Sequence, residues 1–308
     1  MRGRDLIRII GWHCAGWHSA NSIGSLMRKF AEKHPVAFVL LICPLPVVFF
    51  GLIDPLFFQF IYELPGMWYY VPFTWYEVDA TIVYILIIAL IISRLGWWHK
   101  VGLWPISTWK HLPAYIVPTG IMFLPLLPII HPQALGGLFT FILRDLPSTY
   151  FLLFLLIGVD EELFNRGIIQ NSLMARGTKV AIVGSAIVFG LSHISHIFFP
   201  DQTAEQTIHQ ILYSMAWGFG AAVLRIHTGT IVPLIFIHAL QDYFADTTTR
   251  LLLYYNDPQW WFLQLQSWQR TIIYELPYYL MALYGFYLLK KISRQNRLRA
   301  EEQVSALT

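Results

Sequence analysis

Three acidic residues are adjacent in the middle of the chain: Asp160, Glu161 and Glu162, two residues after the apolar run 150–157. Unpaired charge is costly in hydrocarbon, so ionisable side chains in such a segment face a protein interior and indicate a functional site. Arg166 follows Glu162 by four residues, and residues at this spacing meet on one face of a helix. The sequence therefore predicts an internal ion pair between Glu162 and Arg166.

Glu161 is rotated by about 100° from Glu162 on the same helix, so its carboxylate points elsewhere. We therefore predict that Glu162 is neutralised within the protein while Glu161 stays free for chemistry. Asp160 receives no role from the sequence.

Two later segments place histidines at a matching depth. His193 lies 14 residues from Lys179, and His238 lies 13 residues from Arg225, just as Glu161 lies 15 residues from Arg176. At about 1.5 Å per residue, each side chain lies roughly 20 Å along its own helix from the nearest basic residue. These spacings predict that three helices place ionisable groups in one layer, where they form one site.

The composition is that of a membrane protein. Hydrophobic residues make up 56% of the chain and charged residues only 13%, and the apolar runs are long and continuous, which excludes soluble classes and β-barrels. We predict an all-α, polytopic fold of about eight transmembrane helices. The predicted spans are 36–53, 78–93, 112–130, 148–175, 180–199, 206–226, 230–249 and 272–289, the third kinked by four prolines.

Basic residues set the predicted orientation. With a cytoplasmic N-terminus, 18 of the 21 Lys and Arg residues fall on the inner side, and only Arg144, Arg250 and Arg270 fall outside. The positive-inside rule then predicts that both termini are cytoplasmic. This pattern fits a bacterial inner membrane, and a protein of the endoplasmic reticulum would obey the same rule. No basic patch indicates binding to nucleic acid.

We predict one integral-membrane domain over residues 1–308. Residues 1–34 are basic and amphipathic and would lie on the inner leaflet, or would form a frayed tail. Residues 290–308 read as a cytoplasmic tail. Within the spans, small residues four apart (Ala186 with Gly190, Gly218 with Ala222) allow helices five and six to pack closely, although ordinary membrane helices show the same spacing.

Three ordered motifs carry a family resemblance: Glu161-Glu162-x-x-x-Arg166, Phe189-x-x-x-His193 and His238-x-x-x-Asp242. They resemble the CPBP family, also called Abi, of CAAX prenyl proteases and bacteriocin-processing or immunity proteins, which are glutamate-type intramembrane proteases. The resemblance covers roughly residues 145–250. It implies hydrolysis of a membrane-embedded or lipid-anchored peptide or protein without a metal or other cofactor.

The resemblance also implies a catalytic role for each of four residues. Glu161 and His193 would activate a water, and a poorly solvated carboxylate is a usable base near neutral pH. His238 and Asp242 would stabilise the oxyanion. Many family members have Asn at the position of Asp242, and an aspartate donates a hydrogen bond only when protonated. Asp242 could instead orient His238, and Gln241 or Asp246 could substitute for it.

Two alternatives stay open at this stage. His196 could complete a zinc site with Glu161, His193 and His238, although the chain has no His-Glu-x-x-His sequence. The protein could also be a non-catalytic membrane scaffold or an immunity-type protein that keeps the polar network for packing. The identity of the substrate is not encoded in any motif.

Overall fold

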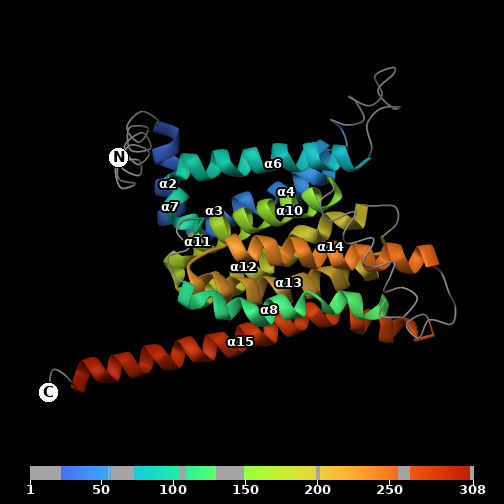
Figure 1. Ribbon diagram of the computed structural model, residues 1–308. Helices are drawn as coiled ribbons and strands as arrows, with labels where there is room; N and C mark the ends of the chain where they lie inside the picture. Colours follow the sequence, from blue (N-terminus) through green and yellow to red (C-terminus); the bar gives the residue numbers. More distant parts are fainter. Residues whose placement is uncertain are drawn as a thin grey trace, which may run out of the picture.

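The computed structural model describes residues 22–54, 56, 73–103, 109–129, 149–198, 202–255 and 264–305 (Figure 1). Within these ranges every regular element is a helix, which confirms the predicted all-α class. The elements of the first half are α2 (Ser22–Lys33), α3 (Pro35–Ile42), α4 (Leu45–Val48), the π-helix η2 (Phe49–Ile53), α6 (Phe73–Leu95), α7 (Trp98–Val101), the 3₁₀ helix η3 (Trp109–Tyr115), α8 (Ile116–Ile121) and the 3₁₀ helix η4 (Leu124–Ile129).

The second half contains the predicted site. Its elements are α10 (Thr149–Glu162), the π-helix η5 (Leu163–Gln170), α11 (Asn171–Leu173), the 3₁₀ helix η6 (Met174–Arg176), α12 (Thr178–Ser192), the 3₁₀ helix η7 (His193–Phe198), α13 (Ala204–Thr228), α14 (Val232–Tyr255) and α15 (Ser267–Ser305). α10 packs between α6 and α14, while α13 packs between α12 and α15. In Figure 1, α6 and α15 lie on opposite sides of this body.

Four helical segments are long and apolar enough to cross a membrane, among the residues that the structure describes. They are Pro35–Ile53, Glu77–Leu95, Thr178–Phe198 and Ser267–Gln295, and they coincide with predicted spans one, two, five and eight. Helices also occupy predicted spans four, six and seven. Spans four and seven carry the acids of the site and His238, which lowers their hydropathy. The protein is thus an integral membrane protein, while the count of eight spans stays a prediction.

The third predicted span is irregular. It is divided into η3, α8 and η4, with Pro113 inside the first 3₁₀ helix. Proline lacks the backbone N–H and clashes with the preceding turn, so four prolines in this segment prevent one continuous α-helix. The predicted kink is therefore a break into three short pieces.

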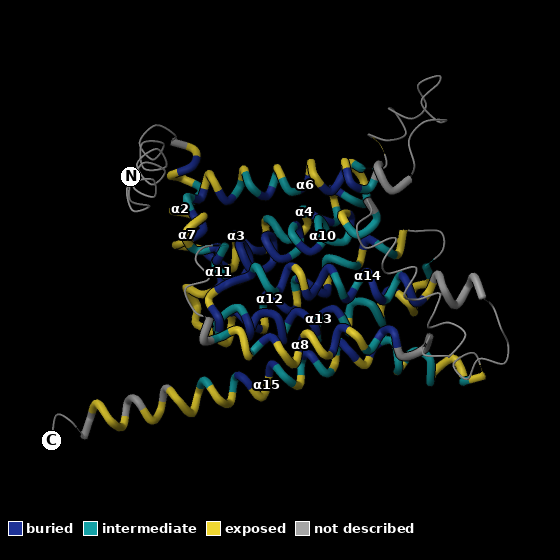
Figure 2. The backbone as a smooth tube through the Cα atoms, viewed as in Figure 1, coloured by how far each residue is buried: buried dark blue, intermediate teal, exposed yellow. Residues whose placement is uncertain are grey.

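The terminal segments differ in how much of them the structure describes. The first 21 residues of the predicted surface segment 1–34 lie outside the described residues, and the rest forms mainly α2. The predicted tail 290–308 is helical as far as Ser305, because α15 continues past the body of the protein (Figure 1). Figure 2 shows this extension as largely exposed, whereas burial is concentrated where α10, α12, α13 and α14 meet.

Glycines allow the central helices to approach closely. A Cβ at Gly158 would lie 2.7 Å from the backbone oxygen of Ile235, so α10 passes directly against the backbone of α14. At the α12–α13 interface, a Cβ at Gly190 would collide with Met215, and one at Gly218 would lie 3.2 Å from the Cα of Ala186. The predicted small-residue pairs therefore lie in this interface. Gly158 precedes Glu162 by about one helical turn, so its contact holds the acids beside α14.

We predict that Gly158→Ala destabilises the protein. The obstacle is a backbone oxygen rather than a flexible side chain, so α10 and α14 must separate, at a cost of about 1–3 kcal/mol. Thermal unfolding of the purified protein in detergent measures this. Gly120→Ala in α8 is the matched control, because nothing lies within 4 Å of its added Cβ. Equal melting temperatures for the two variants would contradict the close approach.

Candidate active site

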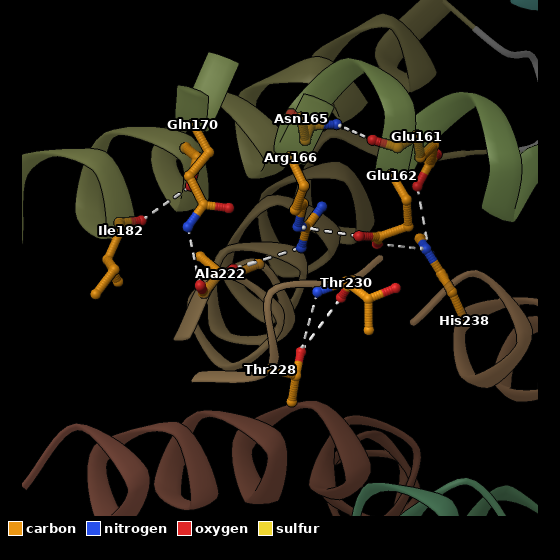
Figure 3. Close-up of polar contacts among 12 residues, drawn as sticks. Glu161, Glu162, Asn165, Arg166, Gln170, Ile182, Ala222, Thr228, Thr230 and His238 are labelled. Carbon is orange, nitrogen blue, oxygen red and sulfur yellow. Dashed lines mark hydrogen bonds and ion pairs between the residues drawn. The ribbon is translucent and has the colours of Figure 1, made fainter. Parts of the chain in front are cut away.

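His238 of α14 lies at the centre of a cluster of carboxylates (Figure 3). Its Nδ1 lies 3.2 Å from Oε1 of Glu162, and its Nε2 lies 3.3 Å from Oε2 of Glu161. The same Nε2 lies 3.5 Å from Oδ2 of Asp242. The side chain of His238 is 7% exposed. Two helices thus bring three carboxylates to one buried ring.

These contacts restrict the protons in the cluster. A carboxylate only accepts hydrogen bonds, so Nδ1 carries a hydrogen that it donates to Glu162. At Nε2 a lone pair would face two carboxylate oxygens. The contacts there are favourable when Nε2 carries a hydrogen, or when Glu161 or Asp242 carries one. The geometry therefore favours His238 as a donor through both ring nitrogens.

Arg166 balances the buried charge of Glu162, as predicted. Its Nε lies 3.2 Å from Oε2 of Glu162, with side chains that are 1% and 0% exposed. Its Nη2 donates to the backbone oxygen of Gly218 at 3.4 Å, and the guanidinium lies 4.7 Å from the ring centre of Phe189, a cation–π distance. Glu162 therefore connects Arg166 to His238 through its two carboxylate oxygens.

A π-helix starts directly after the acids. Leu163–Gln170 form η5, and every residue of it is buried. Such segments often occur at functional sites, because the wider turn changes the direction of side chains and frees backbone groups. Here Asn165 Nδ2 donates to the backbone oxygen of Glu161 at 2.9 Å. The amide thereby stabilises the backbone that carries Glu161 (Figure 3).

His193 has a defined tautomer. Its Nδ1 lies 2.9 Å from the backbone oxygen of Phe189, which can only accept, so Nδ1 carries the hydrogen. In the neutral ring, Nε2 is then an acceptor. His196 is held in a similar way, because its Nδ1 lies 2.8 Å from Oε1 of Gln210. Phe189, predicted as a supporting residue, packs against both His193 and His238, with ring centres 5.4 and 5.8 Å away.

All four predicted catalytic residues border one cavity of about 720 Å³. Glu161, His193, His238 and Asp242 line it, and so does His196. The structure therefore brings the ionisable groups of three predicted spans to one cavity, while their common depth in a membrane stays a prediction. The acids and histidines approach this space from α10, from η7 directly after α12, and from α14.

Sequence reasoning missed several contacts. Glu161 lies against His238, whereas the resemblance pairs Glu161 with His193. Glu162, predicted only as the partner of Arg166, also binds His238. Trp217 of α13 is 1% exposed and covers His238, with ring centres 5.3 Å apart. No spacing signal predicts these contacts, because each joins separate helices.

The alternatives to Asp242 differ from it in position. Asp246 also lines the cavity, and Gln241 is buried. Asp242 is the one whose carboxylate lies near His238 Nε2. In the described ranges, no three His, Cys, Asp or Glu side chains are arranged to hold a metal ion. The expectation of metal-independent chemistry stays a prediction.

Comparison with known proteins identifies one family. Residues 144–244, about one third of the chain, match the model of the family described as type II CAAX prenyl endopeptidase Rce1-like. The match confirms the resemblance to CAAX proteases of the CPBP family over the segment that carries all three motifs. No curated protein and no solved structure matches the chain.

We predict that Arg166→Gln destabilises the protein by about 3–5 kcal/mol, because it leaves a buried carboxylate without its cation. Unfolding in detergent with increasing denaturant measures this. Arg28→Gln is a matched control: Arg28 forms the same four-residue pair with Glu32, but both side chains are 44% exposed. Such surface pairs contribute about 0–1 kcal/mol. The double variant Glu162→Gln/Arg166→Gln should lose less than the sum of the single variants, and additive losses would contradict the pairing.

Proposed function

We propose that the chain is an intramembrane endopeptidase of the CPBP type, which hydrolyses a peptide bond of a membrane-associated peptide or protein. The observation that carries the proposal is the cluster around His238, where Glu161 and Asp242 face a cavity that they share with His193. The family match over residues 144–244 supports the same reaction class.

In the proposed reaction Glu161 is the general base. A water in the cavity donates one hydrogen bond to Glu161 and the other to Nε2 of His193, whose Nδ1 is occupied by the backbone oxygen of Phe189. Glu161 takes the proton as the water oxygen bonds to the carbonyl carbon of the substrate. The π electrons of the carbonyl move to its oxygen, which becomes an oxyanion. General-base assistance of this kind contributes about 10²–10⁴-fold.

His238 supplies the donor for the oxyanion. Its Nδ1 is bound to Glu162, so its Nε2–H is available to the cavity. Asp242 lies beside this nitrogen and orients the ring, or donates a second hydrogen bond when protonated. As the oxyanion re-forms the carbonyl, the C–N bond breaks, and Glu161 returns its proton to the leaving nitrogen. One preorganised donor of this kind contributes about 10²–10³-fold.

The scaffold alternative accounts less well for the cavity. A scaffold gains stability from close packing, and unfilled internal space costs stability in proportion to its volume. In a scaffold, the contacts of Glu162 with Arg166 and His238 would serve packing alone. Glu161, His193 and Asp242 border open space instead, as an enzyme requires.

For the whole molecule we propose one membrane domain with eight spans and both termini in the cytoplasm. The distribution of basic residues supports this orientation. A bacterial cell membrane is the proposed location. The description of the matching family makes a prenylated peptide with a C-terminal CAAX sequence the first substrate to test.

We predict that Glu161→Gln abolishes cleavage while the protein stays folded, because the amide has nearly the same shape but cannot accept the proton. The assay uses a farnesylated, fluorescence-quenched CAAX peptide and, in parallel, mapping of new protein termini in membranes that contain the wild-type or the variant chain. The rate should fall by about 10²–10⁴-fold. The control is Glu32→Gln, which removes an exposed carboxylate that does not line the cavity. Termini that form equally with wild-type and Glu161→Gln chains would refute the proposal.

We predict that chelation leaves cleavage unchanged. In the proposed reaction Glu161 and His193 activate the water, so no step depends on a metal ion. The measurement compares cleavage rates before and after dialysis against EDTA, and again after zinc is added back. Loss of activity with EDTA and its recovery with zinc would overturn the metal-free reaction and favour a site that includes His196.

A further inference from the structure

A second group of polar side chains lines the same cavity beside the proposed catalytic cluster. It consists of Tyr84 of α6, Asp160 of α10 and Asn165 of η5, and each is 2% exposed. We call these three residues the oxygen trio. Of the three, the sequence singles out only Asp160, and it assigns that residue no role. Tyr84 lies outside the segment that matches the family.

Each member of the oxygen trio has an oxygen atom without a hydrogen-bond partner in the structure: the Tyr84 hydroxyl, Asp160 Oδ1 and Asn165 Oδ1. Such groups are uncommon in protein interiors, because buried polar atoms are nearly always paired. Because all three residues line the same cavity, water or a ligand in that cavity would complete the pairing.

The chemistry of the trio selects the ligand. The amide of Asn165 has a fixed orientation, because its Nδ2 donates to the backbone oxygen of Glu161, so its Oδ1 is an acceptor. Ionised Asp160 is an acceptor as well, and a phenol hydroxyl can accept. A ligand with several N–H donors and no acceptors can donate a hydrogen bond to each of these three oxygen atoms. An ammonium and a guanidinium have this property.

The charge around the trio favours a cation. The acid next to Asp160 is Glu161, a second carboxylate, and both act electrostatically on Tyr84. Asp54, Glu77 and Asp246 also line the cavity, and no Lys or Arg is found among its lining residues in the described part of the chain. The lining carboxylates would therefore attract a positive ligand, and the one lining group that the proposal makes cationic, His238, is already in contact with Glu161, Glu162 and Asp242.

We propose that the oxygen trio is a subsite for the cationic side chain, Lys or Arg, of a residue near the cleaved bond of the substrate. This inference rests on the proposed peptidase function, because it places the basic residue beside the bond that Glu161 and His238 act on. Asp160 and Glu161 are adjacent in sequence, so the subsite and the proposed base share one turn of α10. The substrate class is thus a membrane-associated peptide with a basic residue close to its cleavage site.

The first test measures binding without catalysis. Hexylammonium is the probe and hexanol is its neutral counterpart, each added to the full-length protein in detergent while thermal unfolding is followed. We expect hexylammonium to raise the melting temperature of the wild-type and Glu161→Gln proteins, and hexanol to raise it less. Asp160→Asn and Tyr84→Phe should weaken the response to hexylammonium. Asp246→Asn, which removes another carboxylate of the cavity, should keep most of it.

The second test measures specificity. Wild-type and variant chains are incubated with peptides that Glu-C releases from membrane proteins, which keep internal Lys and Arg, and the new termini are mapped by mass spectrometry. The wild-type chain should enrich Lys or Arg at one position near the cut. Asp160→Asn should reduce that preference by about tenfold or more, as expected for the loss of a charged hydrogen bond, while cleavage of other peptides continues.

The outcomes separate the two proposals. If hexylammonium and hexanol act alike on the wild-type protein, or if Asp160→Asn and Tyr84→Phe keep both the response and the preference, the subsite is refuted. If Asp160→Asn fails to fold, Tyr84→Phe still tests the subsite, because this variant keeps the aromatic ring. Loss of its response to hexylammonium would then support the subsite. If hexylammonium binds through the trio but no cleavage depends on Glu161, the peptidase fails and a cation-binding site remains.

Discussion

The buried connection from Arg166 through Glu162 to His238 is the constraint on which the site depends. A charged group that leaves water pays a desolvation penalty of several kcal/mol, and only close partners with good geometry compensate for it. Glu162 has one oxygen close to each partner: Oε2 lies 3.2 Å from Nε of Arg166, and Oε1 lies 3.2 Å from Nδ1 of His238. The imidazole is thereby fixed in orientation, and Trp217 and Phe189 close around it. The connection leaves Nε2 of His238 as the ring nitrogen that faces Glu161 and Asp242.

Close helix packing makes this connection possible. His238 can reach Glu161 and Glu162 only because α10 and α14 nearly touch at Gly158, where any side chain would meet the backbone of Ile235. On the other side, Gly218 lets α13 approach α12 and also offers its backbone oxygen to Arg166. The same glycine therefore serves packing and charge compensation. The polar cluster and the small residues depend on each other, since neither arrangement is favourable without the other.

The sequence predicts the parts of this arrangement that arise within one helix. Glu162 and Arg166 are four residues apart, so their pairing follows from helical geometry. Counting from basic residues also places Glu161, His193 and His238 in one layer. The contacts between helices do not follow from the sequence, because the depth of a residue in the membrane does not fix how its helix is rotated about its own axis. The preference of Glu161 for His238 over His193 depends on how α10 and α14 are rotated. The π-helix after Glu162 and the approach of Tyr84 from α6 have no signal at all in local spacing.

The shared hydrogen at His238 couples the two halves of the proposed reaction. One Nε2–H faces two carboxylates, Glu161 at 3.3 Å and Asp242 at 3.5 Å. When an oxyanion also accepts that hydrogen, the hydrogen bond from Nε2 to Glu161 weakens. Glu161 is then a stronger base at the moment when the water must be deprotonated. In the proposed reaction, an ionised Asp242 would keep a negative group beside the ring, so the imidazole would stay a donor while Glu161 changes its protonation. An aspartate in this role would hold charge on His238 more strongly than an asparagine amide.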